Sequence, residues 1–411
     1  MILMTENYPM LEVEDALARF LVHFHALEPE VVPVLEALGR VLAEDVSARM
    51  DIPPLANSAM DGYVVRCEDT EGAMQENPRR VRVAADLAAG AVLDKPIEPG
   101  TAVRIMTGAP IPMGGEAVIP FEEVETSGSD ILIHKRYPHN SNIRLAGEDV
   151  RADEKVLQQG AILRPQEIGM LAAMGHAAIK VVRQPRVAII STGNEVIEPD
   201  AEWQPGKIRD ANGYSNAAQV LQHGGIPIRL GIARDSVEEI TGKIEAGLQE
   251  KVDLLITTGG VSVGDFDMVK KVLASEGKID FWRVRMKPGK PLAFGIIRGV
   301  PLLGLPGNPV SAMVSFEIFA RPAILKMSGR TQWNKPQINA ILVDGIERKD
   351  DRRHYVRVSL EEKDGIQYAH LTGDQGSGIL LSMVRADGLA IIPEDVRSLP
   401  PNSPVKVVLL D

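Results

Sequence analysis

A glycine-rich segment with two acidic residues is the clearest chemical signal in the sequence. Thr258 to Asp267 reads TGGVSVGDFD and follows an apolar run from Val252 to Thr257. Glycines let a ligand approach the backbone closely, and successive N–H groups ahead of a helix bind anions. Asp265 and Asp267 are suited to hold a hard cation beside a phosphate, although aspartate also caps helices without any ligand. The segment contains neither a P-loop nor a GxGxxG motif, so a tight structural turn explains the glycines equally well.

Two lysines around a Pro-Gly turn form a basic counterpart. Lys287 and Lys290 flank Pro288-Gly289, and such a turn keeps two cations together instead of dispersing them around a helix. The whole chain carries 45 Lys and Arg against 56 Asp and Glu, a net charge of −11. In so acidic a protein, this local concentration of cations favours an anion site over a solvated surface.

A second oxyanion signal lies nearer the C-terminus. Arg353 and Arg357 fall on one face of a predicted strand, with Tyr355 between them. The segment from Gly373 to Gly378 then offers backbone amides and the Ser377 hydroxyl. This combination suits a small oxyanion.

Acidic residues and prolines follow two other strand-like runs. Asn194-Glu195 comes shortly after the apolar run from Arg186 to Ser191. The turn from Pro306 to Ala312 follows a third run, and its prolines are fully explained as a rigid entry into a helix. Asp235 precedes an ordinary helix capping box, and spacing gives it no functional role.

A parallel sheet is the element that would bring these segments together. Three runs, at 186–191, 252–257 and 301–305, are almost wholly apolar. Strands without polar alternation are buried on both faces, which favours a parallel sheet covered by helices. Ligands bind such sheets beyond the carboxyl ends of the strands, where the motifs follow. The residues alone therefore predict an α/β domain with a phosphate and metal crevice, and they do not identify its substrate.

The 411-residue length allows two to four domains, and patterns outside the α/β region predict the others. Apolar residues at helical spacing predict three further helices: 11–24, 34–42 and 165–175. Short β-runs between Gly and Pro turns predict a small all-β module: 81–84, 102–106, 117–120 and 131–134. Alternating strands from Gln337 onward predict a second β-domain at the C-terminus.

Composition excludes several classes of protein. A net charge of −11 has the wrong sign for a chain that holds nucleic acid non-specifically. No run reaches the roughly 18 apolar residues needed to span a bilayer, so we expect no membrane partner. The one cysteine, Cys67, excludes an internal disulfide framework and any multi-Cys metal site. It follows an apolar run, so we expect a packed side chain in a cytoplasmic protein rather than a nucleophile.

Six ordered motifs resemble the MoeA family, the molybdopterin molybdenumtransferases, which are related to the E domains of gephyrin and of plant Cnx proteins. The motifs are SAMDGY (58–63), RIMTGAP (104–110), NIR with GED (142–149), TTGGVSVGDFD (257–267), FWRVRMKPGKP (281–291) and LPGNPVSA (305–312). The resemblance spans essentially the whole chain. It implies insertion of molybdate into adenylylated molybdopterin, with Mg²⁺-dependent release of AMP.

The resemblance also implies a multidomain α/β fold. We expect a three-layer α/β molybdopterin-binding domain with a parallel-rich sheet, an inserted all-β module, a small mixed lobe and a C-terminal β-domain. The expected bounds are 1–26 with 181–331, 52–149, 27–51 with 150–180, and 332–411. The family forms homodimers with the site at the subunit cleft. Its expected partners are a molybdopterin adenylyltransferase and molybdoenzyme maturation proteins.

Residue roles carried over from the family fall on matching positions of this sequence. Catalytic roles fall on Asp61, Thr107, Glu195, Asp235, Asp267 and Lys287. Substrate-binding roles fall on Asp149, Gly259, Gly260, Ser262, Gly264, Arg283, Lys290, Pro306, Pro309, Arg357 and Ser377. The candidate Mg²⁺ ligands are Glu195, Asp235, Asp265 and Asp267. Arg283 stands where some members have Lys, and Asn194 where many have Asp, which leaves Glu195 as the better metal ligand there.

Three other functions compete with this assignment. A stand-alone MogA-like adenylyltransferase shares the α/β domain but lacks the inserted β-module and the C-terminal β-domain. A gephyrin-like scaffold needs a long linker or an extra domain, which this sequence does not encode. A tungsten enzyme stays open, because tungstate and molybdate are nearly isosteric and no residue separates them.

Overall fold

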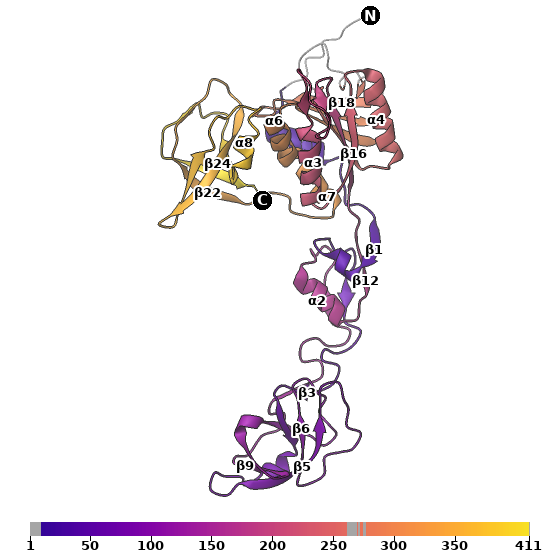
Figure 1. Ribbon diagram of the computed structural model, residues 1–411, viewed down its shortest axis with the longest axis vertical. Helices are drawn as coiled ribbons and strands as arrows, with labels where there is room; N and C mark the ends of the chain where they lie inside the picture. The colour runs from indigo at the N-terminus through magenta and orange to yellow at the C-terminus, as the bar shows by residue number, and fades with distance from the viewer. Residues whose placement is uncertain (1–9, 261–268, 270–271, 274–276, 411) are drawn as a thin grey trace, which may run out of the picture. The chain divides into compact units, whose positions relative to one another are not determined.

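The computed structural model describes residues 10–260, 269, 272–273 and 277–410. The chain divides into two compact units, whose helices and strands are labelled in Figure 1. The first comprises Met1–Glu30, Gly39–Val41 and Val181–Asp411, and the second comprises Val31–Leu38 and Leu42–Lys180. The second unit is therefore an insertion that splits the first unit in sequence.

A six-stranded, mostly parallel sheet forms the centre of the first unit. Its order is β16 (Ile226–Ala233), β13 (Arg186–Thr192), β17 (Leu254–Thr258), β21 (Val300–Leu305), β20 (Pro291–Ile297) and β18 (Gly277–Arg283). The first four are parallel, whereas β20 runs antiparallel to both of its neighbours. The three apolar runs of the sequence are strands of one parallel sheet, as predicted, and the structure places them next to one another.

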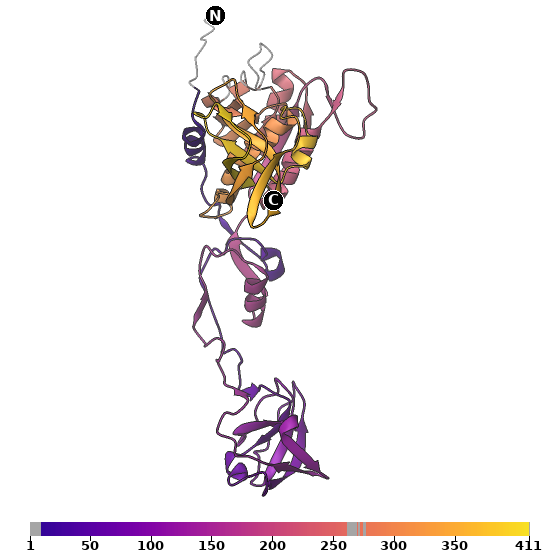
Figure 2. The same ribbon diagram turned by 90° about the vertical axis from the view of Figure 1, so that its left-hand side faces the viewer.

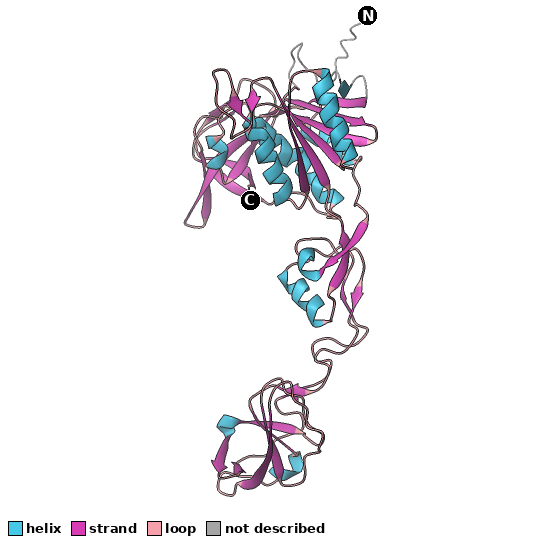
Figure 3. Cartoon of the chain, turned by 45° about the vertical axis from the view of Figure 1, so that its right-hand side comes forward, coloured by secondary structure: helices cyan, strands magenta, loops and turns pink. Residues whose placement is uncertain are grey.

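Helices cover both faces of this sheet (Figure 3). On one face lie α1 (Val13–Leu21), α3 (Ala211–Gln222), α6 (Pro309–Ser315) and α7 (Arg321–Met327), the last two joined by a π-helical turn at Phe316–Ala320. On the other face lies α4 (Val237–Gln249). Along β13, Ile189 packs in the first core while Ala188 and Ile190 pack in the second. Burial of successive residues on opposite faces explains why the strand lacks polar alternation.

A small closed barrel completes the first unit (Figure 2, yellow strands toward the viewer). Its order is β19 (Met286–Lys287), β24 (Arg353–Lys363), β25 (Ile366–Leu371), β22 (Gln337–Leu342), β28 (Ser403–Leu409) and β26 (Gly388–Ile392). Pairing of β24 with β26 closes the sheet, which removes the free edges that an open sheet would expose. The short strands β23 (Ile346–Glu347) and β27 (Ser398–Leu399) and the helix α8 (Leu381–Val384) belong to the connections.

The second unit contains a β-module and a small mixed lobe. The module is a six-stranded sheet in the order β7 (Ala117–Pro120), β4 (Gly62–Val65), β6 (Thr101–Ile105), β5 (Arg79–Leu87), β9 (Asp130–Ile133) and β8 (Val124–Ser127). The lobe carries α2 (Pro165–Ala173) and the short strand pair β2 (Val46–Ser47) with β11 (Lys155–Leu157). A further pair, β1 (Pro29–Pro33) with β12 (Ala178–Val182), has residues in both units, because the division falls after Glu30 and before Val181. All four predicted β-runs of the module are strands. We retain the finer division into four domains as a proposal.

One predicted helix is wrong. The segment 34–42 forms only a 3₁₀ turn, η1 (Val34–Ala37). Gly39 has a φ of +75°, a left-handed conformation that cannot continue a right-handed helix. Leu35 and Leu38 are 74% and 52% exposed, whereas Val41 and Leu42, which follow Gly39, are 2% and 0% exposed, so the apolar residues of the segment do not share one buried helical face. The residues that follow the glycine-rich segment also have a helical apolar pattern, at 268–274. Most of them lie outside the described residues, and the three that are described, Val269, Val272 and Leu273, are helical and buried.

Within the described part of the chain, no helix is long and apolar enough to cross a membrane.

Candidate active site

Two cavities in the first unit share a wall beyond the carboxyl ends of the parallel strands. The first, of about 750 Å³, is lined by residues that follow β13, β17 and β21. The second, of about 710 Å³, is lined by the Lys287 to Pro291 turn and by residues of the barrel. Pro291, Pro306 and Asn308 line both cavities, which makes them parts of one cleft. Its place at the strand ends agrees with the general location of ligand sites in open α/β sheets.

Glu195 and Asp235 bring two carboxylates to the first cavity. Both residues line it, and Glu195 is exposed. Asp235 is fixed by a reciprocal pair of bonds with Asn194. The Asn194 N–H donates to Asp235 Oδ2 at 3.1 Å, and the Asp235 N–H donates to Asn194 Oδ1 at 3.3 Å. Asn194 therefore positions Asp235, a role that spacing in the sequence did not reveal.

Gly259 and Gly260 form the wall of the first cavity after β17. Gly259 has a φ of +92°, and a Cβ atom there would lie 2.8 Å from Thr192 Oγ1. Gly260 has a φ of +64°. Glycine is required at Gly259 both by backbone conformation and by the close approach of β13. The other predicted residues of this segment, Ser262, Gly264, Asp265 and Asp267, lie outside the described residues.

Asp210 is a cavity residue that the sequence analysis did not single out. It caps α3, with Oδ1 accepting from Gly213 N–H at 2.8 Å and Oδ2 accepting from Ser191 Oγ at 2.8 Å. The side chain is only 4% exposed, so this carboxylate serves the architecture of the wall. The signal that could have found it is the aspartate immediately before a helical pattern.

The turn into α6 forms the wall that the two cavities share. Pro309 occupies the first turn of α6, and Pro306 lies at the end of β21. Asn308 Nδ2 donates to Ser377 Oγ at 3.0 Å, and Val310 N–H donates to the Ser377 carbonyl at 3.1 Å. These bonds tie the barrel loop to the helix. Ser377 also lines the second cavity. Pro309 stands at the entry into a helix, as the sequence analysis explained it.

Lys287 and Lys290 both line the second cavity, as their flanking turn predicts. Gly289 between them has a φ of +107°, and a Cβ there would meet Ser315 Oγ at 2.6 Å. Lys287 Nζ lies 3.8 Å from Asp350 Oδ2. Although burial opposes ionisation of Asp350, hydrogen bonds from Arg352 and His354 hold the pKa of Asp350 well below its usual range. The negative charge of Asp350 is thus already compensated by Arg352 and His354, which leaves the Lys287 ammonium available to an anion.

Arg357 places a buried positive charge at the second cavity. The residue is 1% exposed. Its Nε donates to Ser382 Oγ at 3.1 Å and its Nη2 donates to the Gly376 carbonyl at 3.1 Å. Among the described residues, no carboxylate oxygen lies within 4.0 Å of the Arg357 guanidinium, so Arg357 forms no ion pair with them. Burial lowers the pKa of Arg357, with Asp374 acting in the opposite direction, yet a guanidinium remains charged. A buried cation held by neutral groups favours an anionic ligand.

Four predicted residues are among the lining residues of neither cavity. Arg283 lies at the end of β18. Asp61, Thr107 and Asp149 belong to the second unit and are exposed. Thr107 donates to Asp61 Oδ1 from its N–H at 2.7 Å and from its hydroxyl at 2.8 Å, and these bonds lower the pKa of Asp61. Thr107 and Asp61 are thus brought together, whereas Asp149 bonds through its N–H to the Ile52 carbonyl.

Comparison with known proteins places the chain in a family. Three family models match it: "MoeA N-terminal region (domain I and II)" over 11–175, "Probable molybdopterin binding domain" over 188–326 and "MoeA C-terminal region (domain IV)" over 339–410. Molybdopterin molybdenumtransferase 2 of Mycobacterium tuberculosis is 38% identical over 90% of this chain and 92% of its own. Molybdopterin molybdenumtransferase of Staphylococcus epidermidis is 33% identical over 99% of this chain and 97% of its own.

A solved structure agrees with this placement. The crystal structure of the molybdopterin biosynthesis MoeA protein from Pyrococcus horikoshii has a TM-score of 0.83 and 33% identity, covering 98% of this chain and 99% of that one. The multidomain α/β architecture predicted from the sequence is therefore confirmed. The chain belongs to the MoeA family of molybdopterin molybdenumtransferases and is a transferase of molybdenum cofactor biosynthesis.

Proposed function

We propose that this enzyme inserts molybdate into adenylylated molybdopterin and releases AMP in a Mg²⁺-dependent step. The observation that carries the proposal is the two-part cleft. One part offers carboxylates and glycine backbone, and the adjoining part offers cations. A substrate with a pyrophosphate linkage needs both kinds of environment, and a small dianion needs the second.

The carboxylates of the first cavity suit Mg²⁺. Glu195 and Asp235 both line it, Asp235 is held by Asn194, and Mg²⁺ binds to one or two carboxylates together with substrate phosphates and water. We propose that these two residues hold the ion, together with Asp265 and Asp267. When bound, Mg²⁺ would neutralise negative charge that develops on the phosphate leaving group. Asp210 is already engaged by Gly213 and Ser191, so we assign it no ligand role.

The second cavity suits molybdate. Arg357 is fixed by bonds to Ser382 and Gly376, so its guanidinium needs little reorganisation to bind an oxyanion. We propose that Arg357 and Ser377 hold molybdate while Lys287 and Lys290 hold the phosphate side of the substrate. Gly259, Gly260, Ser262 and Gly264 would let the pterin phosphate approach the backbone, and Pro306 and Pro309 would shape the wall. Arg283 lines neither cavity, and we keep it as a substrate-binding proposal only through its family motif.

Residues of the second unit would act across a homodimer. We propose that Asp61, Thr107 and Asp149 complete the site of a partner subunit, because all three are exposed and two of them form an ordered pair. We further propose that the enzyme works in the cytoplasm, where a reducing environment suits its single cysteine. It would receive its substrate from a molybdopterin adenylyltransferase and pass its product to molybdoenzyme maturation proteins.

The direct test measures AMP release from adenylylated molybdopterin by the purified protein, with molybdate and Mg²⁺ both present or omitted one at a time. The proposal requires release only when both are present. AMP release at the same rate with and without molybdate would instead indicate simple hydrolysis of adenylylated molybdopterin. No release from a folded protein under any of these conditions would overturn the proposed reaction and would favour the scaffold interpretation. Replacing molybdate by tungstate in the same assay compares the two oxyanions directly.

A further inference from the structure

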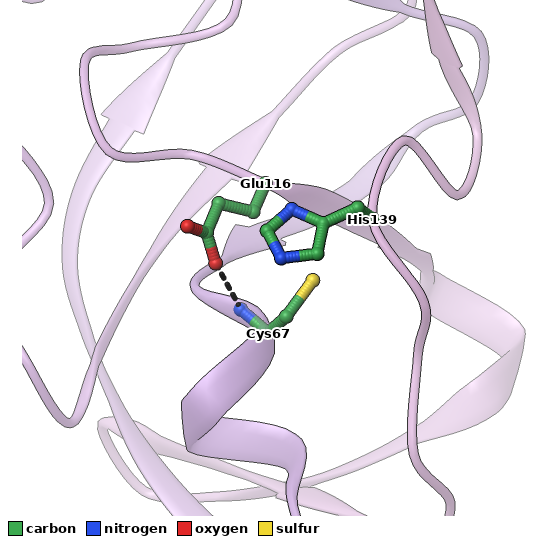
Figure 4. Close-up of side chains that lie close together, drawn as sticks. All are labelled: Cys67, Glu116 and His139. Atoms are coloured by element: carbon green, nitrogen blue, oxygen red, sulfur yellow. Dashed lines mark hydrogen bonds between the residues drawn. The ribbon is translucent and has the colours of Figure 1, made fainter.

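Three potential metal ligands meet in the β-module of the second unit (Figure 4). They are Cys67, Glu116 and His139, whose sulfur, carboxylate oxygen and ring nitrogen all lie within 4.8 Å of one another. Cys67 begins the 3₁₀ turn η2 (Cys67–Thr70), Glu116 immediately precedes β7, and His139 lies in the loop ahead of the short strand β10 (Ile143–Arg144). None of the three lines the cleft described above.

Backbone hydrogen bonds hold the three segments together. Glu116 N–H donates to the Val65 carbonyl at 2.9 Å, and Asn140 N–H donates to the Glu116 carbonyl at 2.8 Å. Cys67 N–H donates to Glu116 Oε2 at 2.7 Å. The positions of all three residues are therefore fixed by the fold before any ligand binds, which lowers the cost of assembling a site.

The ligand set suits zinc. Thiolate, imidazole and carboxylate are the groups that Zn²⁺ accepts, at about 2.0 to 2.3 Å, which places ligand atoms about 3.3 to 3.6 Å apart around a tetrahedral ion. In this structure the three ligand atoms lie within 4.8 Å of one another, so they would have to approach one another by about 1 Å to surround the ion. We propose that Cys67, Glu116 and His139 bind one Zn²⁺ ion. Cys67 is buried and His139 is exposed, so a fourth position would face solvent and hold water.

Binding of a metal ion at this cluster would have to deprotonate the Cys67 thiol. Burial raises the pKa of the Cys67 thiol, and the Glu116 carboxylate raises it further, whereas Arg136 acts in the opposite direction. A divalent ion would reverse this effect because it stabilises the thiolate directly, as metal coordination deprotonates thiols. The competing interpretation treats Cys67 as a packed residue and Glu116 as a backbone cap. That interpretation predicts no metal binding.

The test titrates the purified full-length protein with Co²⁺, a spectroscopic substitute for Zn²⁺. Cys67 is the only cysteine of the chain, so a sulfur-to-cobalt charge-transfer band can come only from this site. We expect the band to saturate at one Co²⁺ per chain and to disappear when Zn²⁺ is added. We also expect Zn²⁺ to protect Cys67 from alkylation. Absence of the band, together with alkylation that Zn²⁺ does not slow, would overturn the proposal.

Variants assign the site to its three residues. His139→Gln changes an exposed side chain and leaves the core intact, and we expect it to weaken Zn²⁺ binding about tenfold or more. Cys67→Ser should abolish the cobalt band. The matched control is His134→Gln, because His134 is in the same module and pairs with Glu125 at 3.5 Å. Equal Zn²⁺ affinity of His139→Gln and the wild type would contradict the assignment.

Discussion

Glu317 provides a sharp test of how the first unit is held together. It lies in the π-helical turn between α6 and α7 and is 7% exposed. Its Oε2 lies 3.3 Å from Arg321 Nε and 3.2 Å from Lys335 Nζ. Its Oε1 accepts from Gln219 Nε2 at 3.0 Å and lies 3.5 Å from His223 Nε2. One carboxylate therefore joins α3, α7 and the segment that leads to the barrel.

The expected cost of Glu317→Gln follows from the pKa of this carboxylate. Burial opposes its ionisation, but the hydrogen bond from His223 and the charge of Lys335 lower the pKa of Glu317 from 4.5 to about 2. At about 1.4 kcal/mol per pH unit, this difference corresponds to about 3 kcal/mol of folding stability at neutral pH. The substitution keeps the volume and removes the charge. We therefore expect the free energy of unfolding of the first unit to fall by about 3 kcal/mol, the scale of a broken buried ion pair.

Tryptophan fluorescence during urea unfolding is the assay. All three tryptophans, Trp203, Trp282 and Trp333, belong to the first unit, so the signal reports that unit. With a urea slope of about 3 kcal/mol/M, the midpoint should move by about 1 M. The matched control is Glu250→Gln. It breaks an exposed pair with Arg186 at 2.9 Å, and such pairs contribute at most about 1 kcal/mol.

The pH dependence distinguishes a charge effect from a packing effect. Because the folded pKa is the lower one, this stabilisation is complete above pH 4.5 and is lost as the pH falls toward about 2. The gap between wild type and Glu317→Gln should shrink from about 3 kcal/mol at pH 7 to about 2 kcal/mol at pH 3.5. A gap that is absent at pH 7, or that stays constant down to pH 3.5, would refute the reasoning.

Three further predictions concern the cleft. Arg357→Ala should raise the molybdate concentration needed for half-maximal AMP release about 10-fold to 150-fold, the value of a charge-assisted hydrogen bond, and leave binding of adenylylated molybdopterin nearly unchanged; equal losses of both would contradict its role. Asp267→Asn should slow AMP release at limiting Mg²⁺, and an unchanged rate would identify the residue as a helix cap. Gly259→Ala should destabilise the first unit by about 1 to 3 kcal/mol in the same urea assay, because its φ is +92° and its Cβ would meet Thr192 Oγ1 at 2.8 Å. Gly378→Ala, in the same cavity with open space around it, should not.

The sheet could be predicted from the sequence because its strands are buried on both faces. Short, almost wholly apolar runs such as 186–191 indicate strands that are buried on both faces of a sheet. The position of the cleft follows from the carboxyl ends of these strands. The same reasoning failed at 34–42, where apolar spacing imitates a helix that Gly39 ends. The apolar pattern is informative along strands that are buried on both faces and misleading at 34–42, where exposed Leu35 and buried Leu42 do not share one helical face.

Contacts between distant segments could not be predicted. The bond from Asn308 to Ser377 joins residues 69 positions apart, and Cys67 and Glu116 are separated by 49. Asn194 gave no sign of holding Asp235, because the two meet only where β13 and β16 end side by side. These relationships depend on the register of the folded sheet and on loop geometry, which periodicity does not encode.

The insertion within the first unit determines an order of events during synthesis. The ring of Phe20 in α1 packs edge-on against the ring of Phe294, with their centroids 4.8 Å apart, and its centroid lies 6.1 Å from that of Phe319. Both partners leave the ribosome long after α1, with the whole second unit synthesised in between. The apolar side of α1 therefore cannot be buried until the residues of its core have been synthesised. The sequence of the second unit, by contrast, is complete once Lys180 has emerged. Because synthesis proceeds from the N-terminus, α1 is the first helix to be synthesised and one of the last elements to pack.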